Sequence, residues 1–363
     1  MPKDFLTLAD WAAEDLLSLL DRARELKQGL RRGERPQSLL GRALAMFFEK
    51  PSLRTHVTFE AGMAQLGGHA ISLRPEQVGI GTREAPRDVA LNLSRWVDGI
   101  VARTFSHALV EELAEVATIP VINGLTDLLH PCQVMADFQT IAERVELKDA
   151  VIAYVGDGNN MANSLLLGVA VLGLSLRVAT PAGHRPARRV QRRAEELAAA
   201  SGAHLSWCED PVEAVTGAGF VYTDAWTSMG QEAQRERRRV EFAAYQVNSS
   251  LLRHAPEAWV MHCLPAHRGE EITDEVLDSE RCIALDQAEN RLHLQKAIMV
   301  WVLGGMIGSA GKPRTTKIRP WYRSAALQGS PGHSSSRSRA GRSVVRPRRS
   351  RQVVRGKKAK RPR

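Results

Sequence analysis

The amino-acid sequence predicts an α/β protein with two doubly wound parallel-sheet domains linked by helices. Short apolar runs alternate with segments of helical spacing, which is typical of βαβ units and parallel sheets. The chain of 363 residues is also long enough for two domains of ordinary size, each with its own core. The apolar runs, in chain order, are residues 43–48, 70–73, 99–102 and 120–122, then 151–155, 175–179, 205–207, 220–223 and 259–262.

The two series of expected strands set the expected domain boundaries. The first series, together with an amphipathic helix over residues 7–30, predicts a domain over residues 1–147. The second series predicts a domain over residues 148–290. A final apolar helix at residues 292–308 is expected to return to the first domain.

The end of the chain differs in composition from the rest. Residues 309–363 are rich in Ser, Arg, Pro and Gly, so we expect a disordered tail there. Residues 312–363 hold 18 of the 50 Lys and Arg residues and no Asp or Glu, whereas the preceding 311 residues hold 32 basic and all 40 acidic residues, a net charge of −8. The overall net charge of +10 therefore describes an acidic body with a separate polycation.

The composition argues against several classes of protein. No apolar stretch approaches the length of a membrane span, and the N-terminus lacks the charged and then apolar layout of a signal peptide. The four cysteines are scattered without a Cys-x-x-Cys pair, which argues against a disulfide or zinc framework. We therefore expect a protein of the reducing cytoplasm without membrane association.

One strand–loop–helix junction has the residues of an anion site. The strand expected at residues 43–48 is followed by Ser52, Arg54 and Thr55 and then by a helix that ends at the glycine pair 67–68. N–H groups at a helix start are unpaired and carry the positive end of the helix dipole, so anions bind there. A guanidinium adds a planar fork that fits two phosphate oxygens. The alternative interpretation is a helix cap beside a solvated arginine.

Further polar residues stand at or just beyond the ends of other expected strands, where open α/β sheets place their ligand crevice. Each one has a structural alternative. His130 could be a hydrogen-bonded structural histidine, Asp224 a helix cap, and Cys263 a small buried hydrophobe. The segments are 103–104, 130–133, 156–161, 224–230 and 262–265, and it is the set that indicates a function.

Taken together, these motifs resemble the aspartate/ornithine carbamoyltransferase family, and within it the ornithine carbamoyltransferases. The resemblance covers about residues 5–308. Ser-x-Arg-Thr at 52–55 and His-Pro-x-Gln at 130–133 are similar to the family's carbamoyl phosphate site, and Ser-Met-Gly at 228–230 with His-Cys-Leu-Pro at 262–265 is similar to its narrower ornithine signature. The resemblance implies transfer of the carbamoyl group of carbamoyl phosphate to the side-chain amine of L-ornithine, giving L-citrulline and phosphate in arginine metabolism.

The resemblance also implies which residues bind carbamoyl phosphate. The helix start and Arg103 would hold the phosphate, Thr55, Arg103 and His130 would donate to the carbamoyl oxygen, and Gln133 would accept from the carbamoyl amide. Gln77 would complete the site from a neighbouring subunit of a homotrimer or a multiple of trimers. The full set is Ser52, Leu53, Arg54, Thr55, Gln77, Arg103, His130, Gln133, Cys263, Leu264 and Arg291.

The implied ornithine site is in the second domain. Asn160 and the Met229 backbone would bind the α-carboxylate, and Asp224 with Ser228 would bind the α-ammonium group. Cys263 would orient the terminal amine, and either Asp224 or Cys263 could take the proton that this amine loses. No metal or cofactor is implied. The implied catalytic residues are Arg103, His130, Asp224 and Cys263.

Two other functions remain open from the sequence. A related carbamoyltransferase could use putrescine or an acylated ornithine, although such acceptors lack the free α-amino acid group that Asp224 and Ser228 would bind. The basic tail could instead bind nucleic acid through its phosphates, with steep salt dependence.

His56 departs from the family pattern, in which many members have arginine at this position. A titratable ring then replaces a permanent positive charge beside the phosphate loop. We therefore expect carbamoyl phosphate binding to weaken as the pH rises.

Overall fold

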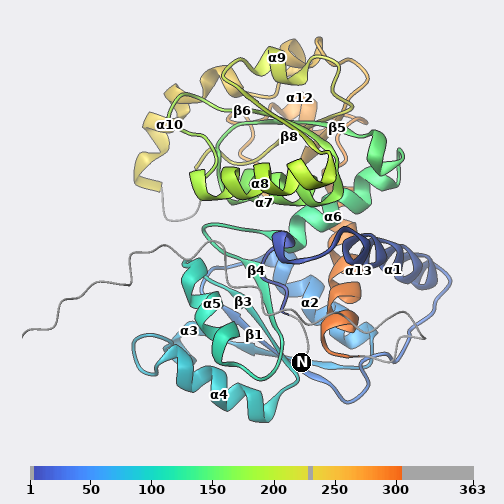
Figure 1. Ribbon diagram of the computed structural model, residues 1–363, viewed down its shortest axis with the longest axis vertical. Helices are drawn as coiled ribbons and strands as arrows, with labels where there is room; N and C mark the ends of the chain where they lie inside the picture. Colours follow the sequence, from blue (N-terminus) through green and yellow to red (C-terminus); the bar gives the residue numbers. More distant parts are fainter. Residues whose placement is uncertain (1–3, 228–231, 305–363) are drawn as a thin grey trace, which may run out of the picture. The chain divides into compact units, whose positions relative to one another are not determined.

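The computed structural model describes residues 4–227 and 232–304, and both predicted sheets are present in it (Figure 1). The first sheet has the strand order β2-β1-β3-β4 and the second the order β7-β6-β5-β8-β9, with all pairs parallel. The doubly wound α/β fold is thus confirmed. The strands are β1 Ala43–Phe48, β2 His69–Leu73, β3 Gly99–Arg103, β4 Val121–Leu125, β5 Val151–Val155, β6 Ser175–Ala179, β7 His204–Cys208, β8 Phe220–Thr223 and β9 Trp259–His262.

Helices cover both faces of each sheet (Figure 1). They are α1 Ala13–Arg31, α2 Leu53–Gln65, α3 Pro75–Val78, α4 Pro86–Trp96, α5 His107–Val116, α6 Pro131–Ala142, α7 Asn160–Leu172, α8 Arg188–Ser201, α9 Pro211–Val215, α10 Arg235–Glu241, α11 Ser249–Leu252, α12 Asp274–Leu277 and α13 Ala284–Val302. Short 3₁₀ helices lie at Leu8–Asp10, Leu147–Asp149, Glu232–Gln234 and Ala243–Tyr245. Within the described residues, no helix is both long and apolar enough to cross a bilayer.

Strand β1 is apolar along its whole length because both of its faces are covered. Successive side chains of a strand point to opposite faces of the sheet. Leu44 and Met46 pack in the same core as Phe59 of α2, whereas Ala45 packs in the core that contains Val89 of α4. Because helices cover both faces, alternation with polar residues is absent from β1, as expected for a buried parallel strand.

Two helices have bounds that differ from the predicted ones. The predicted helix over residues 7–30 is broken: Thr7 caps a short 3₁₀ helix by accepting from the Ala9 N–H at 3.3 Å, Ala12 is extended, and only then does α1 begin. The last helix begins at Ala284 and not at residue 292. Its first turns bury polar residues such as Gln287, which an apolar pattern does not detect. Residues 305–363, including the predicted disordered tail, lie outside the described residues.

A polar seam joins α1, α6 and α13. The Nζ of Lys27 on α1 lies 2.9 Å from Glu143, just after α6, and donates to the Asn290 side chain on α13 at 2.8 Å. It also lies 3.0 Å from Glu289. Lys27 and Asn290 are both buried, so this seam fixes α13 against its neighbours and thereby positions Arg291, one residue after Asn290.

Candidate active site

A cavity of about 840 Å³ lies at the carboxyl ends of the strands. Loops that follow strands of both sheets line it together with Arg291 of α13, which is where ligands bind in open α/β sheets. The predicted site residues among its lining are Ser52, Leu53, Arg54, Thr55, Arg103, His130, Gln133, Asn160, Asp224, Cys263, Leu264 and Arg291.

Three predicted site residues are not among the described residues that line this cavity. Ser228 and Met229 lie outside the described residues. Gln77 is exposed on α3, where its side-chain oxygen accepts from the N–H of Arg74 at 3.3 Å. The role implied for Gln77 belongs to a neighbouring subunit, so it stays a prediction.

The start of α2 forms one wall of the cavity. Ser52 is the N-cap of α2, and its Oγ accepts from the N–H of Thr55 at 3.3 Å, so the capping interpretation also holds. An α-helix leaves its first N–H groups without intrahelical acceptors. The backbone N–H groups of Leu53 and Arg54, two residues that line the cavity, can therefore donate to an anion.

Three guanidinium groups converge on the same cavity. Arg54 comes from α2, Arg103 from the end of β3 and Arg291 from α13. Burial lowers the pKa of Arg103 to about 10, with a further contribution from the like charges of Arg291 and Arg54. Burial also lowers the pKa values of Arg54 and Arg291. All three remain charged at neutral pH, and buried like charges of this kind favour an anionic ligand between them.

Thr55 holds two of these guanidiniums in place. Its Oγ1 accepts from Nη1 of Arg103 at 3.3 Å and from Nη2 of Arg291 at 2.9 Å. A hydroxyl oxygen has two acceptor sites, so the Thr55 hydroxyl proton is left to donate elsewhere. The buried Nε atoms of Arg103 and Arg291 also have no hydrogen-bond partner among the described residues. Buried donors without partners are rare in proteins, and here they indicate a ligand that accepts hydrogen bonds.

His130 stands at the start of α6 beside the guanidiniums. Its backbone N–H donates to Oγ of Ser164 at 2.7 Å, which ties this turn to α7. Burial lowers the pKa of His130 well below its ordinary value, and the charges of Arg291, Arg103 and Arg54 lower it further. The imidazole is therefore neutral at physiological pH and offers one N–H donor and one acceptor.

On the other side of the cavity, a carboxylate and a thiol form a pair. Cys263 donates its S–H to Oδ1 of Asp224 at 3.0 Å. Oδ2 of Asp224 accepts from the Asn159 side chain at 2.7 Å. Burial raises the pKa of the Cys263 thiol well above its ordinary value, and the Asp224 charge raises it further. Cys263 is thus a protonated thiol at neutral pH and not a thiolate.

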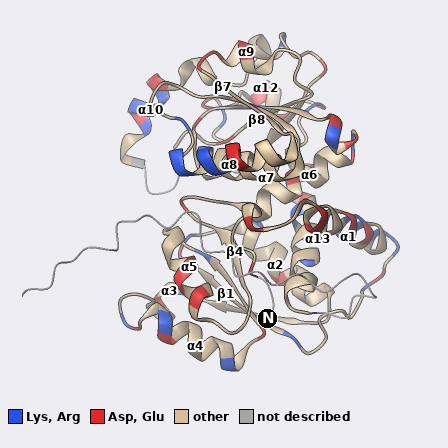
Figure 2. Ribbon diagram, in the orientation of Figure 1, with Lys and Arg blue, Asp and Glu red and all other residues tan. Residues whose placement is uncertain are grey.

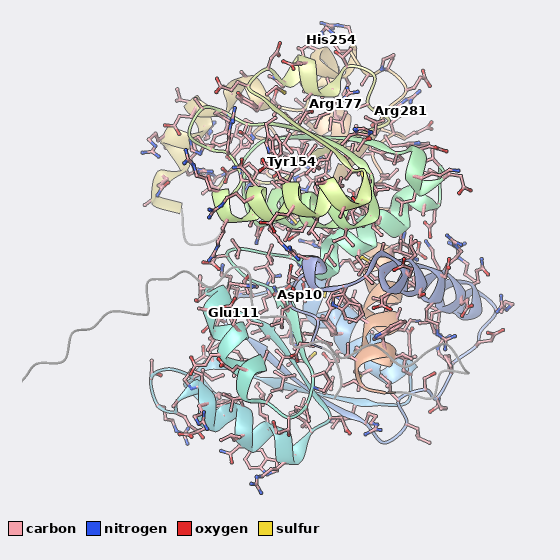
Figure 3. The ribbon with its side chains drawn as sticks, in the orientation of Figure 1. Asp10, Glu111, Tyr154, Arg177, His254 and Arg281 are labelled. Carbon is pink, nitrogen blue, oxygen red and sulfur yellow. The ribbon has the colours of Figure 1, made fainter. Side chains whose placement is uncertain are left out.

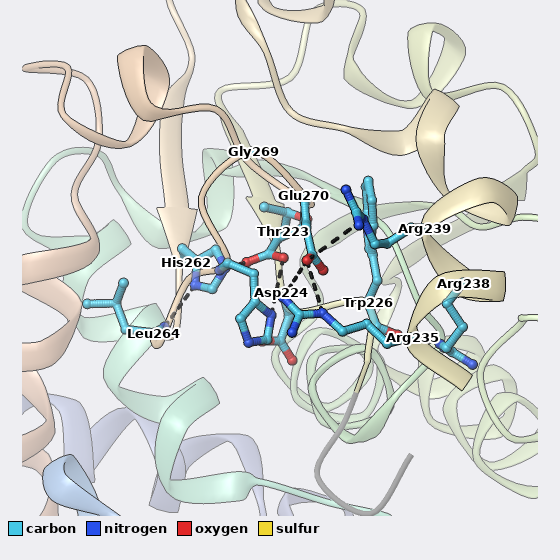
Figure 4. A network of polar contacts seen from close by, with 12 residues as sticks. Thr223, Asp224, Trp226, Arg235, Arg238, Arg239, His262, Leu264, Gly269 and Glu270 are labelled. Carbon is cyan, nitrogen blue, oxygen red and sulfur yellow. Dashed lines mark hydrogen bonds and ion pairs between the residues drawn. The ribbon is translucent and has the colours of Figure 1, made fainter. Parts of the chain in front are cut away.

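His262 fixes the loop that carries Cys263 and Leu264 (Figure 4). Its Nδ1 accepts from the N–H of Leu264 at 2.8 Å, and its Nε2 lies 3.1 Å from Oε1 of Glu271. Because Nδ1 is the acceptor, Nε2 carries the proton and donates to the carboxylate. Both side chains are fully buried, so His262 serves the loop and not the ligand.

Two clusters of described side chains have ligand-type atoms close enough to share a cation. One is Asp224, His262 and Cys263, and the other is His267, Glu270 and Glu271, with the ligand atoms of each within 4.8 Å of one another. In the first, both imidazole nitrogens are already in use. In the second, Glu270 is paired with Arg235 at 2.5 Å (Figure 4). In that second cluster, Nδ1 of His267 and Oε2 of Glu271 have no hydrogen-bond partner among the described residues.

Sequence reasoning named the segment 156–161 but gave no role to Asn159 or Asp157, which both line the cavity. Asn159 caps α7 through the N–H of Met161 at 2.9 Å and also holds Asp224; the only signal in the sequence was a capping residue before a helix. Figure 3 labels Tyr154 of β5, whose hydroxyl donates to the Asp157 carbonyl at 2.8 Å. The Asp157 carboxylate pairs with Arg238 of α10 at 2.5 Å. Arginines also gather at the N-terminal end of α8, and Arg185 just before this helix lines the cavity (Figure 2).

His56 is placed away from the lining residues of the cavity. Its ring stacks on Phe48 with ring centroids 5.3 Å apart, and its Nε2 lies 3.5 Å from Glu60. The histidine follows the phosphate loop in sequence, but helix α2 turns its side chain to a different surface.

Comparisons with known proteins agree with this fold and cavity. The family model "Aspartate/ornithine carbamoyltransferase, carbamoyl-P binding domain" matches residues 3–143, and the model "Aspartate/ornithine carbamoyltransferase, Asp/Orn binding domain" matches residues 148–302. The protein named anabolic ornithine carbamoyltransferase from Pyrococcus furiosus is 49% identical over 306 residues, which are 84% of this chain and 97% of the relative. The ornithine carbamoyltransferase of Anoxybacillus flavithermus is 51% identical over 303 residues, or 83% and 96% of the two chains.

Solved structures give the same result. The ornithine carbamoyltransferase of P. furiosus superimposes with a TM-score of 0.81 at 47% identity, covering 84% of this chain and 98% of that chain. The enzyme of Thermus thermophilus superimposes with a TM-score of 0.75 at 46% identity, covering 84% and 99%. Two family models that together span most of the chain, and relatives at about half identity, lead to one conclusion: the chain belongs to the aspartate/ornithine carbamoyltransferase family.

Proposed function

We propose that this protein transfers the carbamoyl group of carbamoyl phosphate to the side-chain amine of L-ornithine, giving L-citrulline and phosphate. One observation carries the proposal: three charged guanidiniums and the start of α2 line the same cavity as the Asp224–Cys263 pair. An anion and an amine can therefore be held side by side. Such positioning makes a two-substrate reaction effectively unimolecular.

The phosphate of carbamoyl phosphate would bind at the start of α2. The N–H groups of Leu53 and Arg54, the Arg54 guanidinium and the Ser52 hydroxyl are the donors there. Arg103 would bind both the phosphate and the carbamoyl oxygen, since it reaches from β3 to Thr55 at 3.3 Å. The bond between the carbamoyl carbon and the phosphate oxygen then breaks while these donors neutralise the charge of the leaving phosphate.

The carbamoyl oxygen gains negative charge as the amine attacks its carbon. Thr55, Arg103 and the neutral imidazole of His130 would donate to that oxygen, and Arg291 adds charge nearby. Fixed donors in a site that excludes water stabilise such a charge without reorganisation. Gln133 would accept from the carbamoyl NH₂.

Ornithine would bind on the Asp224 side of the cavity, with its α-carboxylate near Asn160. The roles implied for Ser228 and Met229 in this half stay proposals. The attacking amine must lose a proton, and the sequence left Asp224 and Cys263 as alternatives. A protonated thiol cannot take that proton, which leaves the Asp224 carboxylate as the acceptor, with Cys263 orienting it by a hydrogen bond of 3.0 Å.

We further propose the biological setting that the resemblance implies. Residues 1–147 with the returning helix would form the carbamoyl phosphate domain, and residues 148–290 the ornithine domain. A cytoplasmic homotrimer, or a multiple of it, would let Gln77 reach a neighbouring site. The relative from P. furiosus is named anabolic, which supports a role in arginine biosynthesis.

The test is a panel of amine acceptors offered to the purified full chain with carbamoyl phosphate. L-ornithine is expected to give citrulline and phosphate in equal amounts. Putrescine, N-acetylornithine and aspartate are expected to react at least about a hundredfold more slowly, because each leaves charged groups on the Asp224 side of the cavity unpaired. Preferred turnover of putrescine or N-acetylornithine would contradict the assignment of acceptor. Absence of turnover with every amine would contradict the proposed function itself.

A further inference from the structure

A carboxylate behind the cavity collects hydrogen bonds from three elements. Asp137, on α6, is fully buried. Its Oδ1 accepts from the side-chain amides of Gln133, one turn earlier on α6, and of Gln287 on α13, both at 2.8 Å. Its Oδ2 accepts from the hydroxyl of Tyr222 on β8 at 3.0 Å. Three donors around one carboxyl group match the ionised form, which can only accept.

The outer contacts of the two glutamines fix which end of each amide faces Asp137. Oε1 of Gln133 accepts from Nη1 of Arg291 at 2.5 Å, and Oε1 of Gln287 accepts from the backbone N–H of His262 at 2.9 Å. A guanidinium and a backbone N–H are donors only, so each amide oxygen has to face them. Each amide nitrogen therefore faces Asp137. The reversed orientation is unfavourable because it would place the amide oxygen against the carboxylate, and both groups only accept hydrogen bonds.

We propose that Asp137 is a positioning residue that makes the cavity prefer a carbamoyl group over an acyl group, by holding the Gln133 amide with its oxygen toward the ligand. The inference rests on the proposed function and adds a determinant of its substrate specificity. Gln133 lines the cavity, and its oxygen keeps a second lone pair beside the one that Arg291 uses. A carbamoyl NH₂ can donate to that lone pair. The methyl group of an acetyl group of the same shape cannot.

The charge state of Asp137 makes this preference for a carbamoyl group sensitive to pH. Burial raises the pKa of Asp137 to about 6, while its three hydrogen bonds and the charge of Arg291 act in the opposite direction. The ionisable groups that face it are Arg291 from α13, Tyr222 from β8 and Cys263 after β9. Asp137 is ionised at neutral pH and gains a proton below about pH 6. A protonated carboxyl group has one acceptor site fewer and holds Gln133 less firmly.

The next turn of α6 offers a matched control. Thr140 is as deeply buried as Asp137 and accepts from the Asn290 side chain of α13 at 2.9 Å. That contact joins the same two helices through a buried hydrogen bond, yet neither residue lines the cavity. Tyr222 is a second control, since it contacts Oδ2 of Asp137 and leaves the Oδ1 contact with Gln133 intact.

The experiment compares two stable phosphonates that differ only in the group of interest. Phosphonoacetamide carries the carbamoyl NH₂, and acetonylphosphonate carries a methyl group in its place. Isothermal titration of the full chain gives the Kd of each. The parent is expected to bind phosphonoacetamide about tenfold more tightly, as for one buried hydrogen bond. Asp137→Asn keeps the shape of the side chain but replaces a charge-assisted hydrogen bond. It should therefore reduce the ratio of the two Kd values, acetonylphosphonate over phosphonoacetamide, about threefold. Asp137→Ala should bring it close to one.

The ratio separates positioning from a general structural role. Loss of packing or of charge changes the binding of both phosphonates alike and leaves their ratio unchanged. Thr140→Val and Tyr222→Phe are therefore expected to keep the ratio of the parent, even where they lower the thermal stability. The parent ratio should also fall between pH 7 and pH 5, and that of Asp137→Asn should not.

Two results would overturn parts of this account separately. Asp137 variants that keep the parent ratio, in a protein whose parent form makes citrulline, would overturn the positioning role alone. A parent that binds neither phosphonate and makes no citrulline would overturn the proposed function as well.

Discussion

The two halves of the cavity are built from different kinds of charge. The phosphate half gathers the guanidiniums of Arg54, Arg103 and Arg291, which stay charged at neutral pH although burial lowers their pKa values. The amine half relies on the Asp224 carboxylate and the Cys263 thiol. Fixed charge binds an anion at any physiological pH, whereas the attacking amine has to lose a proton before it reacts. At pH values where Asp137 is ionised, binding of the first substrate should therefore depend little on pH, and attack by the second should carry the pH dependence.

The difference also has an energetic side. The buried guanidiniums of Arg103 and Arg291 and the half-buried one of Arg54 repel one another, and an anion bound between them relieves this repulsion. The amine half has no such excess, because Asp224 is hydrogen-bonded by both Asn159 and Cys263. Anionic ligands should therefore stabilise the fold more than amines do.

The largest effect is expected from Arg103→Gln. The kcat/KM for carbamoyl phosphate should fall by about 10³-fold, because one guanidinium serves both the phosphate and the carbamoyl oxygen. Initial rates of citrulline formation measure it. Arg103→Lys keeps the charge without the planar fork, so its kcat/KM should lie between those of the parent and of Arg103→Gln. A loss below tenfold for Arg103→Gln would break the comparison, since the phosphate half would then not depend on its fixed charge.

Asp224→Asn should separate the two halves. We expect kcat/KM for ornithine to fall by about 10²-fold, because the attacking amine loses its proton acceptor and the α-ammonium group loses its ionic partner. The Kd of phosphonoacetamide should change by less than about twofold, since Asp224 lies in the other half. Steady-state kinetics and titration calorimetry give the two numbers. Equal losses in both would mean that the halves act as one unit.

The next prediction concerns the reactivity of Cys263. Burial and Asp224 raise the pKa of this thiol, so its thiolate fraction at pH 8 is small and grows only as the pH rises further. Alkylation by iodoacetamide at pH 8 should be at least about tenfold slower than for a model thiol. Peptide mass spectrometry distinguishes Cys263 from the other free cysteines. Asp224→Asn should speed the reaction, and an unchanged rate would show that Asp224 does not control the thiol.

The sequence predicted the elements whose signal is local. Each strand is a short apolar run, and Ser52 to Thr55 stand in one turn at a helix start, so both could be found from neighbouring residues. The missed contacts join distant positions. Asp137 and Gln287 are 150 residues apart, and Asn159 and Asp224 are 65 apart. Such pairs exist only once the sheets and α13 are assembled, and no periodicity encodes them.

His56 shows that a residue close to the phosphate loop in sequence need not line the cavity. Its replacement gives the smallest expected change in ligand affinity. Sequence adjacency to the phosphate loop predicted pH-sensitive carbamoyl phosphate binding, but the imidazole stacks on Phe48 and faces Glu60 outside the cavity lining. A partly exposed charge at such a place is screened by solvent, so His56→Arg should change the Kd of phosphonoacetamide by about twofold or less. The measurement is that Kd at pH 6 and pH 8 in the parent and the variant. Tight binding at pH 6 that is lost at pH 8 in the parent and restored by His56→Arg would return the histidine to the phosphate half, and the fixed-charge description of that half would then be wrong.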